Sequence, residues 1–164
     1  MTAGVGALAG SANRIITRGF DGRWDELEPL ELPPAAAVVV GDNHDAARAV
    51  WAAATHDIEV LVASRTRVTP NLADALRHSG LALVDGEQVD GPTVERDPIP
   101  GRVWLLTSGS TGRPKQVAHT LASLTTVAGD QPRRTWLCPY AHGAYAWWQV
   151  VTPVSYTHLT LPTN

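Results

Sequence analysis

The sequence has little of what a disulfide-stabilised, nucleic-acid-binding or membrane-spanning protein needs. One cysteine in 164 residues permits no disulfide within the chain, which is compatible with a reducing compartment such as the cytoplasm. The 13 lysines and arginines are outnumbered by 16 aspartates and glutamates, and no basic patch marks a surface for nucleic acid or anionic lipid. No apolar run could cross a bilayer, and the first residues lack the basic leader of a signal peptide. We therefore expect a cytoplasmic location, no nucleic-acid partner and no membrane span.

Several catalytic signatures are missing too. Neither Gly-x-Ser-x-Gly nor Gly-x-Gly-x-x-Gly occurs, and no Ser-His-Asp set is recognisable from its spacing. Asp42, His44 and Asp45 could suggest a metal site, but a helix start with Asn43 as N-cap accounts for them, so we expect no metal ligands there. Cys138 lies in an apolar run and is expected to be buried and inert.

What is present is the composition of a globular domain with its own core, 44% hydrophobic and 18% charged. Short apolar runs alternate with segments of helical spacing, which predicts a parallel sheet covered by helices, an α/β fold. Residues 1–34 are expected to be irregular and 87–100 to form a polar connector. The predicted strands are 35–40, 58–63, 81–84, 103–106 and a returning strand at 116–120, and the predicted helices are 43–56, 70–79 and 121–127, the last capped by Thr120.

The most informative stretch follows the strand at 103–106. Four hydroxyl side chains can donate hydrogen bonds to phosphate oxygens, and two glycines let backbone N–H groups approach an anion. A lysine just beyond adds a mobile positive charge. The predicted phosphate-binding residues are Thr107, Ser108, Gly109, Ser110, Thr111, Gly112 and Lys115.

The contiguous segment 107–115, Thr-Ser-Gly-Ser-Thr-Gly-Arg-Pro-Lys, resembles the phosphate loop of the adenylate-forming (AMP-binding) superfamily, which includes acyl- and aryl-CoA synthetases. It is not a Walker A loop, because no Lys-Ser or Lys-Thr pair follows Gly112. The resemblance implies ATP and Mg²⁺ as cofactors, with the loop holding the β- and γ-phosphates. It implies that a small-molecule carboxylic acid becomes an acyl-adenylate and then passes to CoA or to the phosphopantetheine of a carrier protein.

A second segment, residues 139–148, resembles the Pro-x-x-His part of the same family, which lies beside the acyl or aryl pocket. The resemblance implies that Tyr140 and His142 line a substrate pocket. A helix start with aromatic packing is the alternative, and the sequence leaves both open; Trp147 and Trp148 are expected to be packing residues. Gln116 stands where the family often has glycine.

The resemblance covers only the first part of the family's large domain. The family's motifs for adenine, ribose and the lid lysine are not found, so we expect a truncated, partial parallel-sheet N-terminal domain, inactive alone. Residues 1–34 are expected to be an irregular leader, 35–153 the incomplete domain, and 154–164 an artefactual tail that resembles a translated sequencing adapter. The alternatives are a non-catalytic α/β phosphate-binding module and a phosphate-transferring enzyme of another kind.

Overall fold

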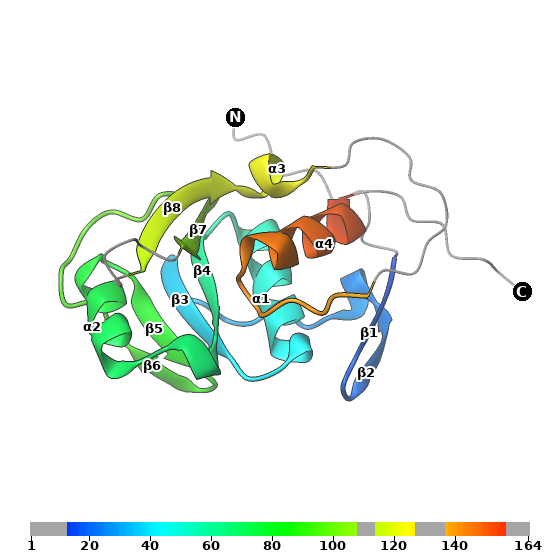
Figure 1. Ribbon diagram of the computed structural model, residues 1–164, viewed down its shortest axis with the longest axis horizontal. Coiled ribbons are helices and arrows are strands. Elements are labelled where there is room, and N and C mark those ends of the chain that lie inside the picture. Colours follow the sequence, from blue (N-terminus) through cyan, green and yellow to red (C-terminus); the bar gives the residue numbers. More distant parts are fainter. Residues whose placement is uncertain (1–12, 108–113, 127–136, 157–164) are drawn as a thin grey trace, which may run out of the picture.

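The computed structural model describes residues 13–107, 114–126 and 137–156, with side chains only up to residue 152. Its centre is a six-stranded mixed sheet in the order β6-β5-β3-β4-β7-β8, with helices on both faces (Figure 1). The α/β prediction is confirmed, but the sheet is not wholly parallel, because an antiparallel strand closes each edge. The parallel strands are β3 (Ala35–Val40), β4 (Glu59–Ser64), β5 (Ala82–Asp85) and β7 (Arg102–Thr107), and the antiparallel edge strands are β6 (Gln88–Asp90) and β8 (Lys115–Thr120).

The central strands are apolar on both faces because helices cover both faces. Five of the six residues in β3 and in β4 are buried, as expected of parallel strands between helical layers. The two strands pair along their whole length, from Ala35 opposite Glu59 to Val40 opposite Ser64. All five predicted strands are confirmed, with boundaries that differ by one residue at most.

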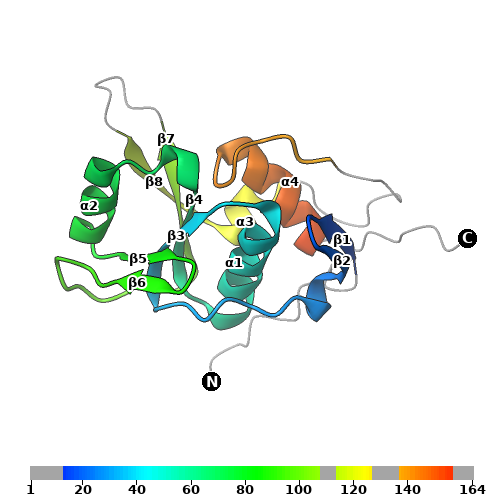
Figure 2. The same cartoon turned by 90° about the horizontal axis from the view of Figure 1, so that it is seen from below.

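Helices α1 and α2 lie on opposite faces of the sheet. The buried side chains of α1 belong to one apolar cluster with Val38 and Val60. Leu76 of α2 belongs to another cluster, with Ala37 and Leu61. Helices α3 and α4 lie on the α1 side, where Trp147 and Trp148 are 2% and 0% exposed, so their predicted packing role is confirmed (Figures 1 and 2). The helices are α1 (Asn43–His56), α2 (Pro70–His78), α3 (Leu121–Leu124) and α4 (Tyr145–Tyr156).

The helix starts follow the capping chemistry of the sequence with one correction. Asp42, not Asn43, is the N-cap of α1, and its carboxylate accepts hydrogen bonds from two backbone N–H groups. Thr69 caps α2 ahead of the proline at the first helical position. Thr120 caps α3 as predicted, but this helix ends at Leu124, sooner than expected.

Two segments in which no strand was predicted, residues 1–34 and the polar connector 87–100, contain strands. In residues 1–34, β1 (Arg14–Thr17) and β2 (Phe20–Arg23) form an antiparallel hairpin whose turn has Gly19 at φ +87°. In the connector after residue 86, β6 pairs with β5 across a turn in which Gly86 has φ +61°. Both hairpins depend on a glycine in the left-handed region, which permits a tight turn between the two strands.

Helix α4 continues across the expected boundary at residues 153–154, and residues 157–164 lie outside the described part. The artefactual origin of residues 154–164 therefore stays a prediction. Across the described ranges, no helix combines the length and apolarity needed to traverse a membrane.

Candidate functional site at the carboxyl edge of the sheet

The strand connections identify one edge of the sheet as the place for a ligand. The chain leaves β3 for α1 on one face and leaves the adjacent β4 for α2 on the other face. Open α/β sheets bind ligands outside the carboxyl ends of strands at such a switch point. In Figure 2 the start of α1 and the segment 137–144 lie together on this side of the sheet.

Thr107 and Lys115 lie at this edge, at the end of the β7–β8 hairpin. They are partners in the antiparallel register, and the hydroxyl of Thr107 donates to the carbonyl oxygen of Lys115 over 3.4 Å. Both residues are exposed to solvent. The other predicted phosphate-binding residues, Ser108, Gly109, Ser110, Thr111 and Gly112, lie outside the described residues.

An ion pair joins the ends of two further strands. Arg65, just after β4, pairs with Asp85 at the end of β5. The guanidinium passes close to Gly41, where an added Cβ would stand 3.3 Å from an Arg65 nitrogen. Both partners are substantially exposed, so the pair contributes little to stability.

His142 is fixed at the start of α1. Its Nε2 lies 2.8 Å from the Oδ1 of Asn43, so Nε2–H donates and the amide oxygen accepts. The ring also meets the ring of Trp147 edge-on, with centroids 6.1 Å apart. Burial lowers the pKa of His142, although the charge of Asp42 opposes the shift, and the imidazole is therefore neutral at pH 7.

Gly143 brings the 137–144 segment against the sheet where β4 and β7 separate. These strands pair at only two positions, the last being Leu61 opposite Trp104. Gly143 has φ +74°, and a Cβ there would overlap the carbonyl oxygen of Val62, the next residue of β4. The segment that carries Tyr140 and His142 is therefore held at the same edge as the end of the β7–β8 hairpin.

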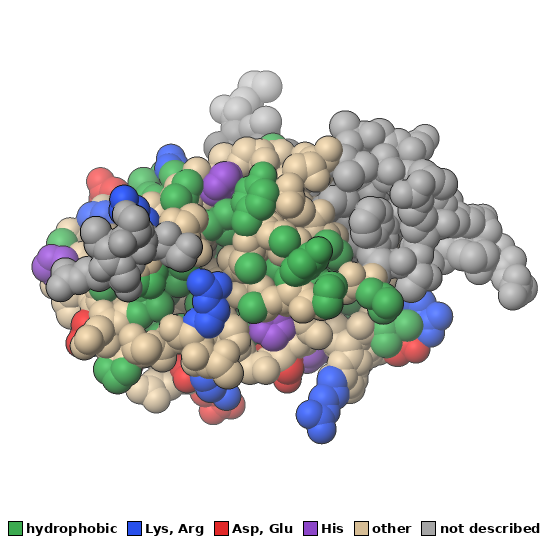
Figure 3. Space-filling model, viewed as in Figure 1, with side chains coloured by type: hydrophobic (Ala, Val, Ile, Leu, Met, Phe, Trp, Pro, Cys, Tyr) green, Lys and Arg blue, Asp and Glu red, His purple; other side chains and the backbone are tan. Residues whose placement is uncertain are grey.

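The surface over this segment is apolar and aromatic. Hydrophobic side chains gather over α4 and the chain leading into it (Figure 3), among them Leu137, Tyr140 and Tyr145. Tyr140 is 47% exposed, so it does not act as a core residue. Cys138 is half-buried against the core rather than fully buried as expected, and burial raises the pKa of its thiol, which leaves it protonated at neutral pH.

The described residues offer no ready-made metal centre. Asp42 uses its carboxylate to cap α1, which accounts for the Asp42–Asp45 cluster as a helix start. Nowhere in the described ranges do three or more His, Cys, Asp or Glu side chains form a group that could hold a metal ion.

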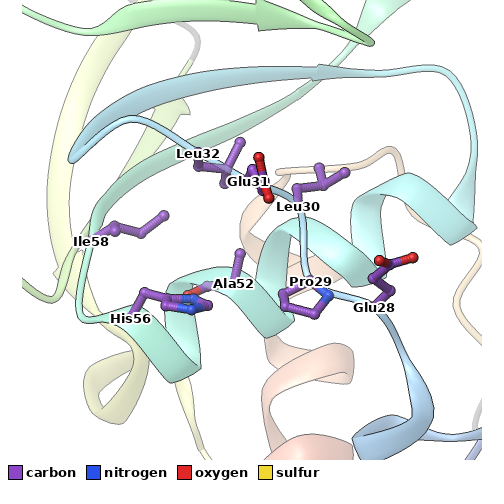
Figure 4. Close-up of a pocket in the computed structure, with 8 residues that line it drawn as sticks. All are labelled: Glu28, Pro29, Leu30, Glu31, Leu32, Ala52, His56 and Ile58. Atoms are coloured by element: carbon purple, nitrogen blue, oxygen red, sulfur yellow. The ribbon is translucent and has the colours of Figure 1, made fainter.

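A separate hollow of about 650 Å³ lies at the other end of α1 (Figure 4). Ile58 and Leu32, which precede β4 and β3, place it at the amino edge of the sheet. Of the sequence-predicted site residues that the structure describes, Thr107, Lys115, Tyr140 and His142, none lines it. Its lining residues are Glu28, Pro29, Leu30, Glu31, Leu32, Ala52, His56 and Ile58.

In the structure, Thr107 is therefore paired with Lys115 across two strands, and His142 is separately hydrogen-bonded to Asn43. Sequence reasoning did not identify Asn43 or Arg65 as site residues, because their partners His142 and Asp85 lie far away along the chain. The only indication in the sequence was their position at the end of an apolar strand. Arg65 directly follows β4, and Asn43 follows β3 and the N-cap residue of α1. No family model, curated protein or solved structure matches this chain.

Proposed function

We propose that this chain carries the ATP-binding part of an enzyme that activates a carboxylic acid as an acyl-adenylate. The acyl group would then pass to CoA or to a carrier-protein thiol. The observation that carries the proposal is the pairing of Thr107 with Lys115 at the carboxyl edge, with the serine- and glycine-containing segment 108–113 between them. The resemblance of segment 107–115 to the phosphate loop of adenylate-forming enzymes supplies the reaction.

The donors fit a polyphosphate. Hydroxyl groups and an ammonium group are hydrogen-bond donors suited to phosphate oxygens, and Lys115 is exposed and able to reach a ligand. Mg²⁺ would neutralise charge on the phosphates. Mg²⁺ is commonly bound largely through substrate phosphates, so the ion would enter together with the nucleotide.

The substrate carboxylate would lie on the His142 side of the same edge. His142 is neutral and oriented by Asn43, and Tyr140 offers an exposed aromatic surface nearby in the chain. This combination of a polar group with aromatic surface suits a small acid with an apolar body.

In the proposed reaction, a carboxylate oxygen attacks the α-phosphorus of ATP. The new oxygen–phosphorus bond forms as the bond to the bridging oxygen breaks, and pyrophosphate leaves. Lys115 and the hydroxyls would hold the β- and γ-phosphates while negative charge shifts onto the leaving group. Catalysis of this kind depends mainly on positioning and electrostatic stabilisation.

Titration of the whole chain with ATP and with pyrophosphate tests the proposal. Replacing Lys115 by alanine removes a charge-assisted hydrogen bond, so affinity should fall about 10- to 100-fold. Arg102→Ala is the matched control, because it removes one positive charge at the opposite end of the same hairpin, where Arg102 faces Thr120. Equal affinity for the parent chain and for Lys115→Ala would contradict the proposal.

A pyrophosphate-release assay tests separately whether this chain catalyses the reaction. The family's adenine, ribose and lid-lysine motifs are not found in these 164 residues, so we expect binding without turnover. Carboxylate-dependent release of pyrophosphate by this chain would overturn the expected inactivity.

A further inference from the structure

We propose that Gln116 is a positioning residue that braces the end of the β7–β8 hairpin against α2 and so holds Lys115 in place. The inference rests on the proposed function, because it assigns Lys115 to the phosphate site. Gln116 stands where the phosphate loops that segment 107–115 resembles often have glycine.

The brace is a side-chain hydrogen bond between distant parts of the chain. The Nε2 of Gln116 donates to the hydroxyl oxygen of Ser79 over 3.0 Å, in a half-buried setting. The same hydroxyl donates to the carbonyl oxygen of Leu76 over 2.7 Å. Ser79 is the C-cap of α2, so Gln116 ties β8 to the end of a packed helix.

Ser79 is itself held from the other side by Arg96. The Nε of Arg96 donates to the carbonyl oxygen of Ser79 over 2.7 Å, and its two terminal nitrogens donate to Glu59 over 2.8 and 2.6 Å. Glu59 is fully buried at the start of β4 and also accepts from the indole N–H of Trp104 over 2.6 Å. A continuous chain of hydrogen bonds therefore leads from the buried start of β4, through Arg96 and Ser79, to Gln116.

Gly80 makes room for this anchor. It has φ +89°, and a Cβ there would lie 2.5–2.9 Å from side-chain atoms of Arg96. Any larger residue would displace the guanidinium stem from Ser79. The contact between Arg96 and Ser79 therefore depends on the backbone conformation of Gly80 as well as on the Arg96 side chain.

The hairpin needs such a brace because β8 is an edge strand. Among the described strands it pairs only with β7, and four of its six residues are exposed. Figure 1 shows the start of β8 beside α2. Gln116 directly follows Lys115 and pairs with Leu106, so its bond acts next to the proposed phosphate-binding residues.

The test compares the parent chain with Gln116→Met, which keeps the size of the side chain but cannot donate. Without nucleotide, amide hydrogen exchange should become faster at residues 115–118, while global stability changes little. Affinity for ATP should fall about three- to tenfold, the effect of one neutral hydrogen bond. Gln88→Met, on the opposite edge strand, is the matched control and should change neither quantity.

A double-mutant cycle with Ser79→Ala separates the brace from a general effect of residue 116. Once Ser79 has lost its hydroxyl, Gln116→Met should change ATP affinity less than twofold further. If the parent chain binds no ATP, the proposed function fails and this inference fails with it. If the parent chain binds ATP and Gln116→Met leaves affinity or hairpin exchange unchanged, the inference alone is overturned.

Discussion

At the scale of single residues, Glu59 is the buried charge on which the connector after β6 depends. Its carboxylate accepts hydrogen bonds from Arg96, from the indole of Trp104 and from the backbone N–H of Ile99. Burial alone would raise the pKa of Glu59, but these hydrogen bonds outweigh it and hold the pKa below its ordinary value. The group is therefore ionised and satisfied at neutral pH.

Removing the cation should expose the cost of burying this charge. Arg96→Met leaves the carboxylate in the core without its ion-pair partner, and we expect a loss of about 3–5 kcal/mol in the free energy of unfolding. Arg67→Met, at an exposed position, should change that free energy by about 0.5 kcal/mol or less. Urea denaturation of the three chains measures both, and similar stabilities would refute the role given to Glu59.

The same site sets an acid-range pH dependence. Because the folded-state pKa of Glu59 lies below the unfolded value, the unfolded chain binds a proton first as pH falls. The contribution to stability is present above the unfolded pKa, near 4.5, and is lost as pH falls towards the folded pKa. Glu59→Gln should flatten this part of the stability profile.

At the scale of elements, the segment before α4 is placed by one backbone position. Gly143 combines a left-handed conformation with direct contact to the carbonyl oxygen of Val62, so no side chain fits there. The position matters because it fixes the neighbouring His142 beside Asn43 at the start of α1.

Gly143→Ala should therefore destabilise the chain by about 3 kcal/mol, since backbone strain adds to overpacking. Gly86→Ala is the matched control, because Gly86 has φ +61° but open space around it, and about 1 kcal/mol is expected from strain alone. Thermal and urea unfolding provide the comparison. Equal losses at the two glycines would show that the contact with Val62 is unimportant.

The predictability of the elements follows from where their stability originates. Strands β3 and β4 are apolar runs that helices bury almost completely, and β7 contains an apolar run in which Val103 and Leu105 are buried. Composition alone therefore indicated these three strands. Strand β6 has only three residues, Gln-Val-Asp, and exists because a glycine turn returns it to β5. A strand this short is too brief for an alternation of apolar and polar residues to predict it.

At the scale of the whole molecule, the sheet separates two edges with different chemistry. The amino edge contains the Glu59 network and the hollow at the end of α1, whereas the carboxyl edge carries Thr107, Lys115 and His142. The sequence placed the last three residues in candidate sites from local motifs. It could not indicate that Asn43 orients His142 or that Ser79 meets Gln116, because 99 and 37 residues separate these partners.

The most direct test is to follow the backbone amide signals of the isotope-labelled chain by NMR while ATP and Mg²⁺ are added. The largest shifts are expected at Thr107, at Lys115 and in the segment 137–144, with little change around His56 and Ile58. Shifts centred on the hollow at the amino edge, or no shifts at saturating nucleotide, would contradict the assignment of the carboxyl edge as an ATP site.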